Sequence, residues 1–580
     1  MLITPAAALD ELRRSTLVRG GMLALHLAAG VGGGIAGDGG LLFEVDDAHV
    51  ASLISAIECE FEPRWVLWSN APAALLRRTG LRLGRSWDLA AVHRLVMGGW
   101  KADPARVWAT AHGLDEHDIP TLETVDLFTV DRHEHDDLER AIDSSGHLRP
   151  EWTASSWTWS TSRLAEWAHV ALTAARLQEA LLAGEGAAPR LLATARCEST
   201  AELLCADLAV AGLPFDRVIA EQIIGDLAGP RPANETEAAT QRRERDALVV
   251  QHSPTFPDAD LRNPTHVKSL LRSVGVEVPD TRAWRLESLR EQHPLIEALL
   301  VWRKAERVAT TFGYGWLDEH LGADGRLRGD WSGCDGAAGR MTATAGLHNM
   351  PALMRDAVVA EPGYVFVRAD LGQIEPRVLA AVSGDAALAR ATVDDDMYAP
   401  VAAALGVDRP TAKVAVLGAM YGQTTGHGAQ ALRRLESAYP VAMRYLSDAD
   451  LAGQHGRNLR TYGGRLIRTG SLTTAQLAER EARSNAAAQG RYARNAMVQG
   501  AAAELFKMWA VIVRARISGA EIVLCLHDEL LVHVPASDAA LVEQLVHDCL
   551  QEAAYRWAPD DSVRFVAEVS VIHRWSDAGH

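Results

Sequence analysis

Residues 365–384, which read VFVRADLGQIEPRVLAAVSG, constrain the fold more than any other part of the chain. Their first positions alternate as in a β-strand, and that strand ends on Asp370. Residues 374–382 then have helical spacing, and Pro376 falls in the first turn, where a missing N–H is tolerated. The pattern predicts a strand that presents a carboxylate at its exposed end, a good position for a metal ligand. An ordinary helix-capping Asp is the alternative.

A second carboxylate is predicted at the tip of a hairpin in residues 522–535, IVLCLHDELLVHVP. Two apolar strands flank His527, Asp528 and Glu529. Three polar residues inside an apolar run are costly to bury unpaired, so a turn or a function must account for them. The pattern therefore predicts a tight turn that presents Asp528 outside a buried hairpin.

Residues 409–422, RPTAKVAVLGAMYG, predict a helix with a functional face. Arg409, Lys413, Leu417 and Tyr421 recur every four residues and share one stripe that spans about 18 Å at about 1.5 Å per residue. Two cations beside the free N–H groups of a helix N-terminus favour an anion, and the stripe is long enough to lie along a nucleotide. A surface helix with a basic end is the alternative.

Charge and cysteine usage narrow the class of protein. The formal net charge is −17, yet residues 401–500 hold 13 Lys and Arg against 6 Asp and Glu. A basic segment in an acidic chain predicts a localised phosphate-binding surface, or else a solvated arginine-rich face. The six cysteines are scattered and form no CxxC pair, which argues against a zinc site and a disulfide framework.

Targeting signals are not evident in the sequence. We find neither a clear signal peptide nor a run of about 18 apolar residues. We therefore expect a cytoplasmic protein with no membrane partner, and we expect a monomer.

The three stretches together resemble motifs A, B and C of the family A DNA polymerases, the family of bacterial DNA polymerase I. Motif A departs from the family pattern at Leu371, Gly372 and Pro376, and motif B departs at Val416 and Leu417. The matching residues are Asp370, Gln373, Ile374, Glu375 and Arg377 in motif A, Arg409, Lys413, Tyr421 and Gly422 in motif B, and His527, Asp528 and Glu529 in motif C.

Two further stretches resemble DNA-contacting segments of the same family. Residues 339–351 supply Arg340 and Asn349, and residues 491–507 supply a helix on which Arg491, Asn495 and Gln499 lie four apart. The resemblance implies that these five residues and His527 contact the primer-template. Tyr398 stands near the place of a phosphate-contacting histidine.

The resemblance implies template-directed addition of dNTPs to a DNA primer by two-metal phosphoryl transfer. Asp370 and Asp528 are the expected ligands of two Mg²⁺ ions, with Mn²⁺ as a possible substitute, and Glu529 completes the catalytic set. The expected nucleotide-binding residues are Arg409, Lys413, Leu417, Tyr421, Gln373 and Glu375, of which Glu375 would exclude a 2′-hydroxyl.

The N-terminal residues resemble, more weakly, the RNase H-like 3′–5′ exonuclease domain of these polymerases. Apolar runs at 22–27, 41–45 and 65–68 predict strands, and the glycine-rich residues 32–37 predict a hairpin turn between two of them. The acidic metal ligands of such nucleases are missing from the expected places, where for example Ala74 stands. We expect a retained fold without nuclease chemistry, in which Asp88 is structural.

The expected fold is a multidomain α/β protein in which this RNase H-like domain precedes a right-hand polymerase. The predicted parts are the exonuclease-like domain (1–185), thumb (186–300), palm (301–385), fingers (386–495) and the rest of the palm (496–580). Two rival functions remain at this point. A single-subunit RNA polymerase shares the palm, and the altered motif positions would also suit a catalytically silent DNA-binding homologue.

Overall fold

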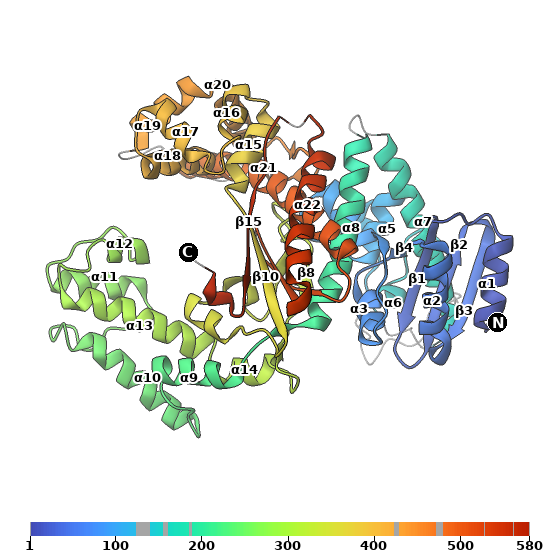
Figure 1. Cartoon of the computed structure of the whole chain (residues 1–580), viewed down its shortest axis with the longest axis horizontal. Coiled ribbons are helices and arrows are strands. Elements are labelled where there is room, and N and C mark those ends of the chain that lie inside the picture. The colour runs from blue at the N-terminus through green and yellow to red at the C-terminus, as the bar shows by residue number, and fades with distance from the viewer. Residues whose placement is uncertain are drawn as a thin grey trace. The chain divides into compact units, whose positions relative to one another are not determined.

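The computed structural model describes residues 2–122, 140–154, 160–184, 188–422, 428–470, 479–526, 528–560 and 562–578. The chain forms two compact units, whose elements are labelled in Figure 1. Unit 1 comprises Met1–Ala211, Asp330–Thr342 and Val367–Val571, and unit 2 comprises Gly212–Gly329, Ala343–Phe366 and Ile572–His580.

The N-terminal part of unit 1 is a mixed five-stranded sheet in the order β3-β2-β1-β4-β5. Strand β1 is antiparallel to β2 and parallel to β4, β3 is antiparallel to β2, and β5 is parallel to β4. The strands are β1 (Met22–Ala28), β2 (Gly32–Gly37), β3 (Leu41–Asp46), β4 (Arg64–Leu67) and β5 (Arg85–Asp88). The three strands predicted from apolar runs are confirmed.

Helices cover both faces of this sheet (Figure 1). Leu23 and Leu25 of β1 pack into one apolar cluster, whereas Met22 and Ala24 pack into another, because successive side chains of a strand point to opposite faces. The first face is covered by α1 (Pro5–Arg14), α2 (Asp47–Phe61) and α3 (Ala71–Arg78), and the second by α4 (Leu89–Met97), α5 (Pro104–His112), α6 (Pro150–Thr153) and α7 (Thr161–Ala183).

The predicted hairpin turn at residues 32–37 is wrong, because this stretch is the strand β2. Helix α7 crosses β2 so closely that a Cβ atom at Gly34 would lie 2.1 Å from the backbone N of Ala165. Gly34 therefore allows the close approach of two backbones. A glycine-rich sequence alone does not distinguish this role from that of a turn.

Asp88 ends β5 and caps α4, as its expected structural role requires. Its carboxylate accepts a hydrogen bond of 2.8 Å from the N–H of Ala91, and the side chain is buried. Burial and the nearby Glu202 carboxylate raise the pKa of Asp88.

The C-terminal part of unit 1 contains a four-stranded sheet in the order β13-β14-β10-β15. Strand β10 (Tyr364–Leu371) leads into α15 (Ile374–Ser383), and β13 (Glu521–Leu526) and β14 (Glu529–Pro535) form an antiparallel hairpin. Both local predictions are thus confirmed. Strand β15 (Ala567–Ile572) completes the sheet, and α22 (Ala539–Trp557) packs against β14 and α21.

A group of helices follows α15 in unit 1 (Figure 1). Helix α21 (Glu479–Arg516) runs from α20 in this group to α8, α22 and β13. The other members are α16 (Ala386–Ala391), α17 (Tyr398–Leu405), α18 (Arg409–Tyr421), α19 (Gly428–Ala438) and α20 (Pro440–Gln454). The chain also contains the two-residue strands β8 (Trp331–Ser332), β9 (Thr342–Ala343), β11 (Leu459–Arg460) and β12 (Leu466–Ile467).

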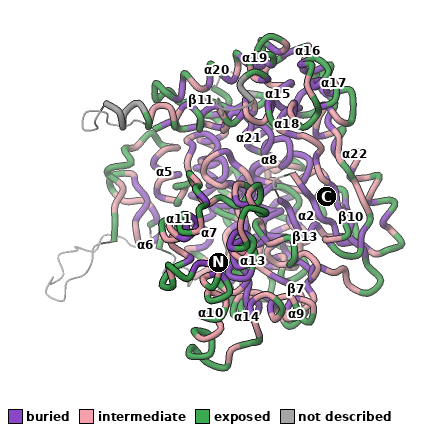
Figure 2. Tube along the Cα trace, turned by 90° about the vertical axis from the view of Figure 1, so that its left-hand side faces the viewer, coloured by how far each residue is buried: buried purple, intermediate pink, exposed green. Residues whose placement is uncertain are grey.

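The segment Ser484–Arg516 of α21 is long and apolar enough to cross a membrane by length and composition, although polar residues such as Glu504 and Lys507 interrupt the apolar run. However, 83% of its most apolar window is buried inside the protein, and Figure 2 shows the segments around α21 and α8 largely in the colour of buried residues. Such burial is typical of the core helix of a globular protein.

Unit 2 is built mainly of helices around one apolar cluster. Val267, Leu270 and Leu271 of α11 pack there against Leu295 and Leu299 of α13. The helices are α9 (Arg217–Ala228), α10 (Glu235–Val250), α11 (Pro264–Ser273), α12 (Ala283–Glu287), α13 (Pro294–Thr311) and α14 (Tyr314–His320), and β6 (Leu213–Pro214) pairs with β7 (Arg326–Leu327). The sequence predicts a thumb beginning at residue 186, whereas unit 2 begins at Gly212. The five-part division remains a prediction.

Helix α8 (Ala188–Ala211) lies in unit 1, where it packs against β5, α3 and α4 on the N-terminal side and against α21 and β13.

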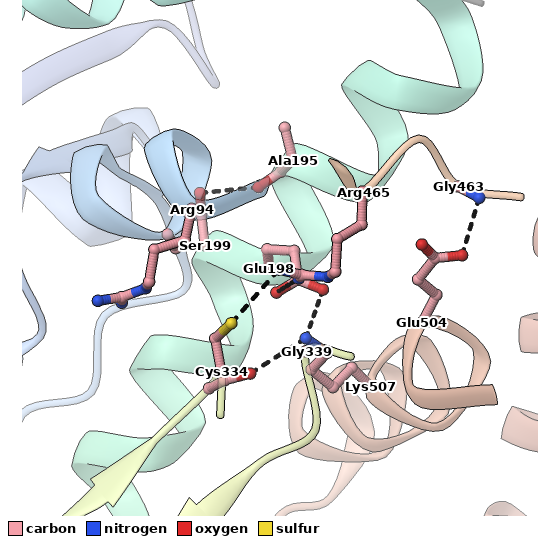
Figure 3. Close-up of polar contacts among 12 residues, drawn as sticks. Arg94, Ala195, Glu198, Ser199, Cys334, Gly339, Gly463, Arg465, Glu504 and Lys507 are labelled. Carbon is pink, nitrogen blue, oxygen red and sulfur yellow. Dashed lines mark hydrogen bonds and ion pairs between the residues drawn. The ribbon is translucent and has the colours of Figure 1, made fainter. Parts of the chain in front are cut away.

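A buried cluster of charged side chains lies between α8 and α21 (Figure 3). Glu198 of α8 forms ion pairs with Arg465, at 2.5 Å, and with Lys507 of α21, and each of these side chains is at most 2% exposed. Lys507 also donates to the carbonyl of Gly333, and Arg465 donates to the sulfur of Cys334. The cluster therefore fixes the segment before Arg340 between α8 and α21.

Candidate active site

The structure brings the two predicted metal-ligand carboxylates together. The N–H of Leu371 donates to the carbonyl of Asp528 at 2.9 Å, so the end of β10 adjoins the hairpin turn. Burial, together with the negative charges of Asp370 and Glu529, raises the pKa of Asp528 to about 7. Burial also raises the pKa of Asp370, although the positive charge of Arg368 opposes this rise. The two aspartates are therefore close, mutually repelling and poorly solvated.

Arg368 is a site residue that the sequence analysis did not single out. Its Nη2 donates to Asp370 Oδ2 at 2.8 Å, and its Nε donates to Glu529 Oε1 at 2.6 Å. The only sequence signal is a cation inside an apolar strand, two residues before Asp370 and hence on the same face of β10.

The carboxylate oxygens of Asp370 and Asp528 fit a divalent cation such as Mg²⁺. Oxygen is the ligand atom that Mg²⁺ prefers, and a cation would relieve the repulsion that raises the pKa of Asp528. Within the described ranges no group of three or more His, Cys, Asp or Glu side chains is arranged to hold a metal. Two carboxylates completed by phosphate oxygens from a substrate are nevertheless a common way to bind Mg²⁺.

Helix α18 carries the predicted stripe. Arg409, Lys413 and Tyr421 are exposed and Leu417 is half-buried, whereas the opposite face is buried against neighbouring helices. Asp408 caps the helix by accepting from the N–H of Thr411 at 2.8 Å. Among the described residues we find no hydrogen bond or ion pair to the Lys413 amine, so its charge is available to a ligand.

Arg409 is held by a carboxylate that the sequence analysis did not identify. Its Nε and Nη2 donate to the two oxygens of Asp396 at 2.5 and 3.2 Å. The guanidinium also lies 5.8 Å from the ring centroid of Tyr398, and burial raises the pKa of Tyr398 to about 12. Tyr398 is therefore a neutral hydrogen-bonding group, and an anion that binds Arg409 has to compete with Asp396.

Glu375 interacts both with Tyr421 of the α18 stripe and, through its charge, with Asp528. The Tyr421 hydroxyl donates to Glu375 Oε2 at 3.1 Å, and Gln499 of α21 is also hydrogen-bonded to this carboxylate. Burial raises the pKa of Glu375, and these hydrogen bonds together with the charge of Arg340 oppose the rise. Glu375 is in turn near enough to Asp528 to raise the pKa of that residue.

The turn between β10 and α15 is strained at Gln373, whose φ of 52° is left-handed although the residue is not glycine. Its side-chain oxygen accepts from the N–H of Met397 at 3.0 Å, so it is engaged with the protein. Arg377, fully buried, donates to the carbonyl of Gly372 in the same turn at 3.1 Å and to the carbonyls of Thr392, Asp394 and Asp395. Strain of this kind is usually retained where a site needs it.

The predicted DNA-contacting residues are only partly brought together. Arg491, Asn495 and Gln499 share one side of α21, with Arg491 packed beside Gly422 at the end of α18. Asn495 Oδ1 is buried and has no hydrogen-bond partner among the residues that the structure describes. Arg340 lies in unit 1 and pairs with Asp335 at 3.4 Å. The exposed Asn349 belongs to unit 2, and His527 lies outside the described residues.

The pKa of Asp528 predicts how stability depends on pH in the absence of divalent cations. It is about 7 in the folded protein against an ordinary value of 3.8, so the folded state binds this proton more tightly than the unfolded state. The resulting stability is complete below pH 3.8 and is lost as the pH rises through about 7. We expect the free energy of unfolding in EDTA to fall by about 2–3 kcal/mol between about pH 5 and pH 8. Urea unfolding measures this fall, which should be smaller in Asp528→Asn. An equal fall in both proteins would contradict the assignment.

Residues 265–577 match the sequence profile of the family described as DNA polymerase family A. DNA polymerase I of Chloroflexus aurantiacus is 30% identical over 324 residues, which cover 50% of this chain and 33% of that protein. The thermostable DNA polymerase I of Thermus aquaticus is 29% identical over 328 residues, or 51% of this chain and 38% of that protein. The chain thus matches little more than a third of the length of these relatives.

A solved structure shares the fold of the whole chain. The POL domain of Pol1 from M. smegmatis, in complex with DNA primer-template and dNTP, superposes with a TM-score of 0.69 and covers 100% of both chains. Because its sequence is only 22% identical, this similarity shows the fold alone.

Proposed function

Because the chain belongs to DNA polymerase family A, we propose that it extends a DNA primer along a template by adding dNTPs. Members of this family generally use divalent metal ions. One observation carries the proposal above the others: the adjoining turns of β10 and the β13–β14 hairpin set Asp370 beside Asp528. Simple DNA binding does not require two repelling carboxylates at one point.

The residues of the site have distinct tasks in this proposal. Asp370 and Asp528 hold Mg²⁺, or Mn²⁺ in its place, and Glu529 orients Arg368 behind them. When bound, the divalent cations supply the positive charge that phosphoryl transfer needs at the primer 3′-oxygen and at the leaving pyrophosphate. Arg409 and Lys413 bind the triphosphate from the α18 face.

Other residues select the nucleotide and position the DNA. Glu375, held by Tyr421, lies against the sugar and disfavours a 2′-hydroxyl, while Leu417 and Tyr421 pack near the base and Gln373 shapes the turn beneath it. Arg340, Asn349, Arg491, Asn495, Gln499 and His527 contact the primer-template. The choice of deoxynucleotides separates this proposal from the single-subunit RNA polymerase alternative.

We further propose that the N-terminal sheet is an RNase H-like exonuclease domain that has lost its chemistry. A mixed sheet covered by helices on both faces supports the fold. Ala74 stands where the second exonuclease motif would place its Asp, which supports the loss. We also propose that the protein is a cytoplasmic monomer without a membrane partner.

Primer extension on a gel tests the proposed function. A 5′-labelled primer on a longer template is incubated with Mg²⁺ and either no nucleotide, dNTPs or rNTPs. We expect extension with dNTPs, at least about tenfold slower extension with rNTPs, and no shortening without nucleotide. Shortening would overturn the inactive-exonuclease proposal. Preferred rNTP use would favour the RNA polymerase, and no extension with retained DNA binding would favour the silent homologue.

A further inference from the structure

Arg368 is a buried cation at the centre of an otherwise apolar strand. Its neighbours Val367, Ala369 and Leu371 are buried, and its own side chain is only 11% exposed. A buried charge is tolerated only when it is paired and hydrogen-bonded. Here the pairing is made with Asp370 and Glu529.

The guanidinium joins two adjacent strands at the point where both adjoin the acidic turn. Asp370 is at the end of β10 and Glu529 begins β14, and one planar guanidinium spans both carboxylates at 2.8 and 2.6 Å. Such charge-assisted hydrogen bonds fix the direction of each carboxylate. Glu529 is 9% exposed, so this pair is shielded from solvent.

The same contact places a positive charge directly on a proposed metal ligand. Asp370, Asp528 and Glu529 together carry three negative charges when ionised, and Arg368 neutralises one of them. A divalent cation that binds Asp370 is therefore attracted less strongly than it would be without Arg368, and it is repelled by the guanidinium beside its ligand. Coulombic repulsion over a few ångströms persists even in water-like surroundings.

We propose that Arg368 is a resident counter-ion that positions Asp370 and keeps the affinity of the site for divalent cations low until a nucleotide is bound. The inference rests on the proposed function, because it takes Asp370 and Asp528 as the metal ligands. In the resting protein Arg368 balances the carboxylates. The triphosphate then supplies the additional negative charge that favours occupancy of the site by the metal. Binding of the metal would therefore depend on binding of the nucleotide.

Direct binding of Mn²⁺, without DNA or nucleotide, tests this role. The electron paramagnetic resonance signal of free Mn²⁺ is followed during titration of the wild type, Arg368→Met, Arg368→Gln and Arg368→Lys. We expect the two neutral variants to bind Mn²⁺ at least about tenfold more tightly than the wild type, and the lysine variant to stay within about threefold. Arg13→Met is the matched control, since Arg13 is an exposed arginine that also pairs with two carboxylates.

The outcomes distinguish this inference from the proposed function. If the methionine variant does not fold, the glutamine variant carries the test, because glutamine retains a hydrogen-bond donor. Unchanged or weaker Mn²⁺ binding in a folded neutral variant would overturn the inference. The gain should disappear in the double variant Arg368→Gln, Asp528→Asn, and its persistence there would equally overturn it. Failure of primer extension by a wild type that passes these tests would remove the polymerase function and leave the counter-ion role standing.

Discussion

Replacing Asp528 by asparagine is expected to slow primer extension by about a thousandfold or more. Asparagine preserves the shape of the side chain but removes the negative charge that would bind the cation, a charge that burial and Asp370 disfavour when no cation is bound. Single-turnover extension of a labelled primer measures the rate. Primer-template affinity, measured by fluorescence anisotropy, should change by less than about threefold, because phosphate contacts made elsewhere dominate DNA affinity.

Asp560→Asn is the matched control for this experiment. Asp560 is an exposed carboxylate beyond the end of α22, and its replacement removes the same charge from unit 1. We expect it to extend primers at the wild-type rate. Wild-type extension by Asp528→Asn would exclude Asp528 from the chemistry, and equal losses in both variants would point to net charge as the cause.

Replacing Glu198 by alanine is expected to lower the free energy of unfolding by about 3–5 kcal/mol. The substitution leaves Arg465 and Lys507 without their shared carboxylate, and both side chains are at most 2% exposed. Two uncompensated buried cations are far more costly than the loss of a surface ion pair. Urea unfolding followed by tryptophan fluorescence measures the difference.

Glu60→Ala provides the comparison, because Glu60 is 36% exposed and pairs with the exposed Arg13. Its loss should leave the free energy of unfolding almost unchanged, because exposed ion pairs are screened by solvent. A similarly small effect in Glu198→Ala would mean that water or a shift of the side chains compensates the two cations, and the cluster would then contribute little to the joint between α8 and α21.

Local patterns in the sequence predicted the elements that carry the site. The alternation before Asp370, the helical spacing around Pro376 and the apolar runs on either side of Asp528 each depend on a few neighbouring residues, and the structure has these elements. The stripe on α18 was predictable for the same reason, since one helical period places its four residues on one side.

Contacts between distant segments were not predictable in this way. Arg368 and Asp396 gain their importance from partners on other elements, and one sequence without tertiary information gives no sign of them. The same limit explains the error at residues 32–37, where glycine serves a close helix crossing at Gly34. Helix α8 lies in unit 1, and not with the residues that follow it, because it packs against elements from both ends of the chain.

The packing of α8 affects whether the N-terminal domain could be lost during evolution. A domain joined by a linker can be lost from a gene once its own reaction is no longer selected. Here β5 of the N-terminal sheet and β13 of the hairpin both pack against α8, so that a deletion ending near residue 187 would expose apolar side chains of this helix such as Leu203. Selection for the proposed polymerase site would then be enough to maintain the N-terminal domain, whether or not that domain hydrolyses anything.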